Sequence, residues 1–199
     1  MYPNSIKDLI ENFKNLPGIG GKTAERLTFS MIDFDKKRLT AFSDAIIQIR
    51  DKVCRCEVCG NFSDEVKCSV CSDSERDHSM IFVVEKPKDI ILFERLGVYR
   101  GVYHVLNGLI SPLDGVGPDD INISKLIDRI DREQISEIIL AVKPSVEGET
   151  TSLYISRLLN GKNVKVTKIA HGVPLGADID YIDTLTLELA IEDRKEIIS

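Results

Sequence analysis

Five cysteines packed into one short segment constrain this chain more than any other feature of its sequence. They lie at Cys54, Cys56, Cys59, Cys68 and Cys71, and the chain of 199 residues has no others. Cys56 and Cys59 form one C-x-x-C pair and Cys68 and Cys71 form a second. Two such pairs supply the four thiolates of a closed tetrahedral zinc site, which stabilises a segment too short to build its own core. We therefore expect a structural zinc ion on these four residues.

Free thiols and disulfides are the alternative interpretations of the cluster. The N-terminus lacks the basic-then-apolar pattern of a signal peptide, and no stretch has the roughly 18 apolar residues of a membrane helix. We therefore expect a cytoplasmic protein without membrane contact, and that compartment disfavours disulfides. Cys54 falls outside both pairs, and we expect a free thiol there, with an exchange of roles between Cys54 and Cys56 left open.

The sequence after the cysteines alternates between short apolar runs and helical patterns. Buried runs of strand length, separated by crossover helices, predict a parallel sheet covered by helices on both faces. The fold class is therefore mixed α/β, with a closing helix over residues 180–194. The expected strands are 80–84, 102–106, 137–141 and 164–169, and the expected helices between them are 89–96, 121–130 and 151–159.

Three amphipathic helices are expected before the cysteines, over residues 5–14, 22–31 and 35–52. Apolar residues recur at helical spacing in each of them, which predicts one buried face per helix. In the third helix the residues expected to be buried are Leu39, Phe42, Ile46 and Ile49.

A glycine-rich turn, LPGIGG at residues 16–21, joins the first two helices and is followed by Lys22 and Thr23. The Gly-Lys-Thr sequence suggests a P-loop, but that motif needs a glycine where Leu16 stands and a strand before it. A helix-hairpin-helix fits better. The alternative is a plain helical hairpin with a solvated basic face.

A helix-hairpin-helix binds DNA through its phosphates. We expect Gly18 and Gly20 to leave backbone N–H groups unpaired at the start of the second helix, where the helix dipole favours an anion. Lys22 and Arg26, four residues apart, share one helix face and are expected to neutralise neighbouring phosphates without reading sequence. The charge distribution agrees, because residues 1–55 hold ten Lys/Arg against seven Asp/Glu in a chain of net charge −6.

Three glutamates are candidate site residues of the α/β domain. Glu85 ends the first expected strand, and Glu147 and Glu149 follow the third. Ligand groups in α/β domains gather at the carboxyl ends of parallel strands, so these carboxylates could converge on Mg²⁺, which binds carboxylates together with phosphate oxygens. The alternative is a set of solvated acids in loops and at helix N-termini. His104 is expected to be a buried, hydrogen-bonded histidine, His78 meets a zinc site already filled by four cysteines, and His171 has no evident acid–base partner. No G-x-S-x-G nucleophile motif is present.

Taken in order, these motifs resemble the RecR family of bacterial recombination mediators over nearly the whole chain. No single motif is decisive, but their ordered series is specific. The segments that carry the resemblance are 16–20 and 22–27 in the hairpin, the four paired cysteines, and residues 83–85, 103–108, 111–118, 147–151 and 172–176.

The resemblance implies a Toprim fold for the α/β part and a tetrameric ring that encircles or clamps single- and double-stranded DNA. It implies RecO, and in many bacteria RecF, as partners in loading recombinase onto single-stranded gaps, within the nucleoid. Glu85, Glu147 and Glu149 would then serve partner contacts, and the protein would be non-enzymatic. The implied regions are a helix-hairpin-helix at 1–53, a C4 zinc finger at 54–72, a Toprim domain at 79–174 and an oligomerisation segment at 175–199.

Two departures from the family pattern bear on function. Glu147-Gly148-Glu149 replaces the Asp-x-Asp pair of Toprim enzymes, and the longer side chains weaken Mg²⁺ coordination. Gly21 adds a third glycine to the hairpin, which loosens it and predicts weaker DNA binding. Two alternatives to a clamp stay open: a Mg²⁺-dependent Toprim nuclease or primase-like enzyme, and a zinc-stapled protein-interaction module with incidental DNA affinity.

Overall fold

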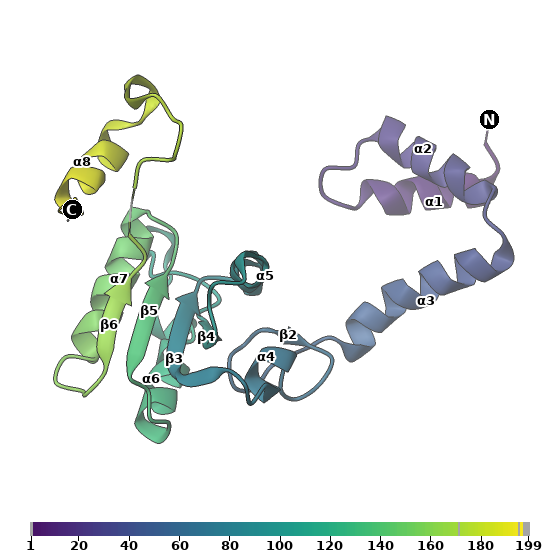
Figure 1. The fold of residues 1–199 in the computed structure, drawn as a ribbon. Coiled ribbons are helices and arrows are strands. Elements are labelled where there is room, and N and C mark those ends of the chain that lie inside the picture. Colours follow the sequence, from purple (N-terminus) through teal and green to yellow (C-terminus); the bar gives the residue numbers. More distant parts are fainter. Residues whose placement is uncertain (1, 171, 195, 197–199) are drawn as a thin grey trace. The chain divides into compact units, whose positions relative to one another are not determined.

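The chain divides into two units, residues 1–53 and residues 54–199, which are described separately (Figure 1). The computed structural model describes residues 2–170, 172–194 and 196. Residues 1, 171, 195 and 197–199, which fall within the regions expected at 1–53, 79–174 and 175–199, lie outside the described residues. Within the described ranges, no helix has the length and apolarity needed to cross a membrane.

The N-terminal unit consists of three helices, as expected from the apolar spacing. They are α1 (Asn4–Lys14), α2 (Gly21–Ile32) and α3 (Lys36–Lys52). The carboxylate of Asp35 accepts a hydrogen bond from the Arg38 N–H at 2.7 Å, and this cap starts α3 one residue later than expected. The buried side chains of the unit are few: Ile10, Ala24 and Thr28.

The apolar face of α3 is not buried, contrary to the expectation from its sequence. Leu39, Phe42, Ile46 and Ile49 are 38%, 44%, 57% and 67% exposed. Helical periodicity identifies an apolar face, but it does not say whether the same chain supplies the surface that covers it. Among residues 2–53 of the N-terminal unit, nothing buries this face.

The second unit is built on a four-stranded, wholly parallel sheet, which confirms the expected mixed α/β class. The strand order is β4-β3-β5-β6. The chain steps one way from β3 to β4 and the other way from β4 to β5 and β6, so right-handed crossovers place α5 on one face and α6 and α7 on the other (Figure 1). The strands are β3 (Asp77–Val84), β4 (Gly101–Val105), β5 (Glu137–Ala141) and β6 (Lys165–Lys168), and the helices are α5 (Pro87–Leu96), α6 (Ile123–Arg132) and α7 (Val146–Leu158).

Both faces of the sheet are largely buried along β3, β4 and β5, as near-continuous apolar strands require, whereas edge strand β6 is only partly covered. On the face covered by α5, the ring of Phe82 stacks on Phe93 with centroids 4.6 Å apart. On the opposite face, the buried guanidinium of Arg129 in α6 donates a hydrogen bond to the Tyr103 carbonyl at 2.8 Å. The next residue of β4, His104, is 2% exposed and bonds through Nε2 to the Asn122 carbonyl at 2.8 Å.

Short elements complete the second unit. The antiparallel pair β1 (Cys54–Arg55) and β2 (Phe62–Ser63) and the turn α4 (Ser69–Ser72) frame the cysteines. Two 3₁₀ turns, η1 (Pro112–Asp114) and η2 (Pro118–Asp120), lie between β4 and α6. After β6 come η3 (Ile179–Tyr181) and α8 (Thr184–Glu192).

Two helix boundaries differ from the sequence-based expectation because capping residues set them. Helix α7 starts at Val146 rather than at residue 151, since the Ser145 hydroxyl accepts a hydrogen bond from the Gly148 N–H at 3.3 Å. Helix α8 starts at Thr184 rather than at residue 180, since the Asp183 carboxylate accepts one from the Thr186 N–H at 2.9 Å. The first shift places Glu147 and Glu149 in the first turn of α7 instead of in a loop.

Candidate metal centre and nucleic-acid interface

The four paired cysteines converge on one point. The sulfurs of Cys56, Cys59, Cys68 and Cys71 all lie within 4.8 Å of one another, and three of the four residues are buried. Backbone N–H groups point at two of these sulfurs: that of Cys68 lies 3.3 Å from the Cys56 Sγ, and that of Asn61 lies 3.5 Å from the Cys59 Sγ. Such bonds stabilise negative charge on the sulfurs and orient them toward a shared ligand.

The chemistry of this donor set fits zinc. Hydrogen bonds to Cys59 and Cys68, followed by burial, raise the pKa of the Cys71 thiol. Four sulfurs this close cannot all carry charge unless a cation compensates it, and Zn²⁺ is the ion that prefers four thiolates in a closed tetrahedral site. Zinc is therefore the cofactor of this segment, and its role is structural because four protein ligands leave no position open. Cys54 lies outside the cluster, where its exposed sulfur contacts the Ser63 carbonyl at 3.2 Å.

The zinc segment is packed onto the sheet. The Val105 N–H of edge strand β4 donates to the Cys59 carbonyl at 2.8 Å. Cys56, Cys59 and Cys68 belong to the same buried cluster as the strand residues. Gly60 has a φ of +77°, and a Cβ there would lie 3.4 Å from Val105. The zinc segment thus covers the sheet edge at β4, so loss of the metal should destabilise the α/β core.

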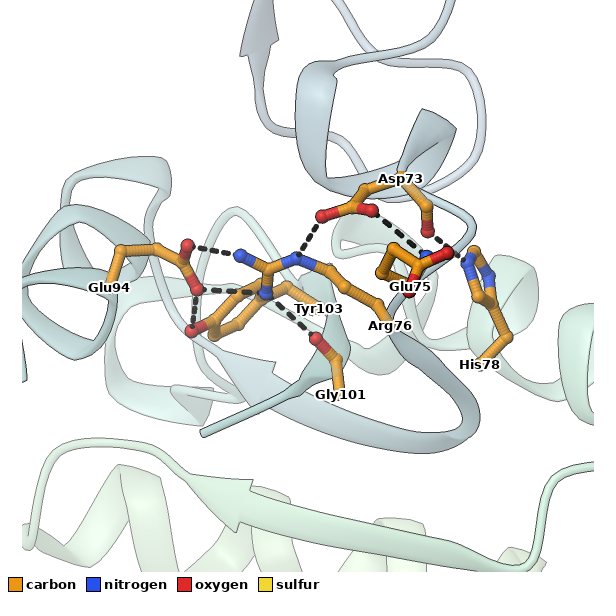
Figure 2. Close-up of polar contacts among 7 residues, drawn as sticks. All are labelled: Asp73, Glu75, Arg76, His78, Glu94, Gly101 and Tyr103. Atoms are coloured by element: carbon orange, nitrogen blue, oxygen red, sulfur yellow. Dashed lines mark hydrogen bonds and ion pairs between the residues drawn. The ribbon is translucent and has the colours of Figure 1, made fainter. Parts of the chain in front are cut away.

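A polar network connects the residues that follow the zinc segment to the sheet (Figure 2). The guanidinium of Arg76 bonds to both carboxylate oxygens of Glu94 in α5 and donates to the Gly101 carbonyl at 3.0 Å. The Tyr103 hydroxyl donates to the same carboxylate at 2.7 Å. Burial raises the pKa of Glu94, but the bonds from Arg76 and Tyr103 outweigh it and hold that pKa below its ordinary value. This network was not predicted from the sequence, in which its only nearby signal is Arg76, five residues after Cys71.

The glycine turn presents unpaired backbone donors. Gly18 adopts a φ of +82°, a conformation that only glycine adopts readily, whereas Gly20 is extended and precedes the first residue of α2. The Ala24 N–H bonds to the Gly20 carbonyl at 2.9 Å. No described residue accepts a hydrogen bond from the N–H groups of Gly20, Gly21 or Lys22. These donors stand at the positive end of a twelve-residue helix, the arrangement that binds a phosphate.

The two cations expected beside the turn are available for a ligand. Lys22 and Arg26 are not buried, and neither forms an ion pair with any residue that the structure describes. They lie one helical turn apart, so both side chains extend from the same face of α2. On the opposite face, Ala24 and Thr28 are buried.

The three glutamates do not come together. Among the described residues, the four cysteines are the only group of three or more ligating side chains close enough to share an ion. Glu85 pairs with Lys86 at 2.9 Å beside the end of β3, whereas Glu149 pairs with Lys168 of β6 at 2.9 Å. The two carboxylates therefore pair with lysines of different segments, Lys86 between β3 and α5 and Lys168 in β6. The Ser145 hydroxyl holds the pKa of the half-buried Glu147 below its ordinary value.

Lysines line the cavity where Toprim acids would be expected to act. A hollow of about 430 Å³ lies where β3 and β5 end, the point at which the strand order reverses. Its charged lining consists of Glu85 and Asp89 together with Lys86, Lys88 and Lys143. These lysines were not predicted as site residues, although Lys86 and Lys88 closely follow Glu85 in the sequence.

Comparison with protein-family models matches four consecutive segments. Residues 6–50 match the RecR helix-hairpin-helix, and residues 53–73 match the four-cysteine zinc finger domain of RecR. Residues 79–170 match a Toprim domain, and residues 172–195 match the RecR C-terminal region. These matches follow the order of the glycine turn, the sulfur cluster and the parallel sheet described above. The chain belongs to the RecR family.

Proposed function

We propose that this protein is a non-enzymatic DNA-binding clamp and scaffold, which acts with RecO, and with RecF where present, to help load recombinase onto single-stranded gaps. Its RecR domains give it a role in recombinational DNA repair, and its helix-hairpin-helix and zinc finger indicate nucleic-acid binding. The proposal adds the mode of binding, the partners and the absence of catalysis. It also places the protein at the bacterial nucleoid, in the cytoplasm.

The observation that carries the proposal is the free end of α2. Unpaired N–H groups at Gly20, Gly21 and Lys22, flanked by the side chains of Lys22 and Arg26, supply a phosphate site and two neutralising charges. Backbone donors and cations on phosphates hold DNA without reading its sequence. A repair clamp has to work on any sequence, so this chemistry suits it.

An assembly of several copies, with the tetrameric ring as its expected form, supports useful affinity. One hairpin neutralises few phosphates, whereas linked copies bind with a much higher effective concentration. The uncovered apolar residues of α3, such as Phe42 and Ile46, support self-association, because exposed apolar area of this kind marks an interaction surface. We assign the segment from residue 175 onward to the same role, where Leu175 and Tyr181 are 105% and 89% exposed.

The second candidate function is a Mg²⁺-dependent Toprim enzyme, which the presence of a Toprim domain keeps open. A Mg²⁺ site needs carboxylates that share one point, whereas Glu85 is paired with Lys86 between β3 and α5, and Glu149 is paired with Lys168 of β6. These pairings favour a scaffold over an enzyme.

An end-labelled gapped duplex, incubated with the protein, Mg²⁺ and nucleotides and resolved on a denaturing gel, separates the two functions. The scaffold predicts strands of unchanged length, although a native gel of the same mixture shows a complex. Shortened or extended strands that Glu147→Gln abolishes would establish the enzyme. Glu188→Gln on α8 is the matched control, since it removes one carboxylate far along the chain from the Toprim acids.

A further inference from the structure

We propose that the loop at residues 109–120 is an apolar-tipped, acidic docking surface for a basic protein partner, with Leu113 as its anchor. This inference rests on the scaffold role proposed above and names the chemistry of the partner. Leu113 is 98% exposed, the highest value for any large apolar side chain described between residues 77 and 170. A leucine held fully in water gives up about 2 kcal/mol of burial free energy, which a partner surface would recover.

The loop holds Leu113 in a defined position. Ser111 and Val116 exchange backbone hydrogen bonds of 3.0 and 2.9 Å beneath it. The Ser111 hydroxyl donates to the Asp114 carboxylate at 2.6 Å, and Gly115 takes the left-handed conformation that closes the turn at a φ of +72°. A side chain presented on a preorganised loop loses little further entropy on binding, which is the property of an interface anchor.

One threonine links this loop to the first turn of α7. The Thr151 Oγ1 accepts a hydrogen bond from the Ile110 N–H at 2.8 Å and donates one to the Glu147 carbonyl at 2.7 Å. Thr151 is fully buried, so both bonds are shielded from water. The buried Thr151 therefore fixes the loop that carries Leu113 to the first turn of α7, which holds Glu147.

The charge of this surface selects its partner. Residues 101–124 contain no lysine or arginine, and the exposed Asp114, Asp119 and Asp120 lie within the loop. The adjoining turn of α7 adds Glu147. An acidic surface repels DNA phosphates and steers a basic protein toward it. The occupant we assign is thus a protein with a basic rim around an apolar pocket, and not nucleic acid.

Binding of the full-length protein to its cognate RecO tests this assignment. Leu113→Ser should weaken RecO binding at least tenfold, because truncation of an interface anchor costs about 2 kcal/mol or more. Val98→Ser is the matched control, since Val98 is 84% exposed in the loop after α5; it should leave the affinity within twofold. Asp119→Asn should slow association at low salt, and the difference should disappear at high salt.

The outcomes separate this inference from the proposed function. RecO binding by Leu113→Ser within twofold of the wild type would overturn the docking surface and leave the scaffold standing. A loss of gapped-DNA binding in Leu113→Ser that matches its loss of RecO binding would also overturn it, because the loop would then contact DNA. A wild-type protein that binds gapped DNA but not RecO would overturn the docking surface together with the RecO part of the proposed function.

Discussion

Arg76 and Glu94 join the zinc-binding segment to the α/β domain through a two-pronged ion pair, with Nη1 and Oε1 3.0 Å apart (Figure 2). The Arg76 side chain is 11% exposed and that of Glu94 is 31% exposed. The paired geometry matches the planar guanidinium to the carboxylate and cannot be reproduced by a lysine.

Removal of the Arg76 guanidinium should destabilise the protein. We expect Arg76→Leu to lower the free energy of unfolding by about 2 kcal/mol at neutral pH, because Glu94 would lose its charged hydrogen bonds in a partly buried site. The Glu94 pKa is depressed, so this contribution exists above the carboxyl's unfolded pKa of about 4.3 and is lost as the pH falls through the folded value. Urea unfolding of both proteins at pH 7 and pH 3 checks this, and a gap that does not narrow at pH 3 would contradict it.

Zinc should be needed by the whole second unit. Cys59→Ser should abolish stoichiometric zinc, measured by atomic emission, and should lower the melting temperature of the α/β domain, because Cys59 is part of the same buried cluster as the strands. Cys54→Ser is the matched control and should retain one zinc per chain. Full zinc in Cys59→Ser, or its loss in Cys54→Ser, would show that the ligands have been assigned wrongly.

His104 should make the fold sensitive to acid. Burial, opposed by the bond to the Asn122 carbonyl, lowers the pKa of His104 to about 4. The folded state therefore disfavours protonation of His104. The free energy of unfolding should be highest above the unfolded pKa of about 6.5 and should fall by about 3 kcal/mol as the pH drops to 4. His104→Gln keeps a hydrogen-bonding group without this titration, so its stability curve should be flatter across the same range. Parallel curves for the two proteins would show that His104 does not titrate in this way.

Two glycines should respond in opposite ways to alanine. A Cβ at Gly21 meets no atom within 4 Å, so Gly21→Ala should stabilise α2 by about 0.5–1 kcal/mol and tighten DNA binding while keeping the N–H. A Cβ at Gly148 would lie 1.9 Å from the Lys143 carbonyl, so Gly148→Ala should destabilise the sheet domain by more than about 2 kcal/mol. Thermal unfolding checks both, and DNA binding by Gly21→Ala that is unchanged or weaker would contradict the loosened hairpin.

Short-range patterns in the sequence were sufficient to predict the helices and strands and the metal ligands. The spacing of Cys56, Cys59, Cys68 and Cys71 predicted the cluster because two short turns determine where each pair of sulfurs points. Apolar runs predicted β3, β4 and β5 because these parallel strands are largely buried on both faces. Strand β6 was also predicted, although it is only partly buried. The helix-hairpin-helix followed from its glycines, of which Gly18 needs a positive φ.

Long-range relationships were not predictable in the same way. The pairing of Glu149 with Lys168 depends on the start of α7 and on the order of the strands, neither of which apolar spacing reports. Ser145 is recognisable in the sequence as an N-cap residue, and that assignment would have placed Glu147 and Glu149 in the first turn of a helix. Helical spacing identified the apolar face of α3, but it did not show that Ile49 would stay exposed in the N-terminal unit.

The salt dependence of DNA binding tests the central claim most directly. Lys22→Ala with Arg26→Ala removes the two cations beside the free N–H groups, so the slope of log K against log salt should fall by about 1 to 2 and affinity should drop for every DNA sequence tested. The control, Lys125→Ala with Arg132→Ala, makes the same change of charge on α6, where both side chains are exposed, and should leave the slope unchanged. An unchanged slope and affinity in the Lys22 and Arg26 variant would contradict DNA binding by the hairpin, and would make this protein an interaction module whose DNA affinity is incidental.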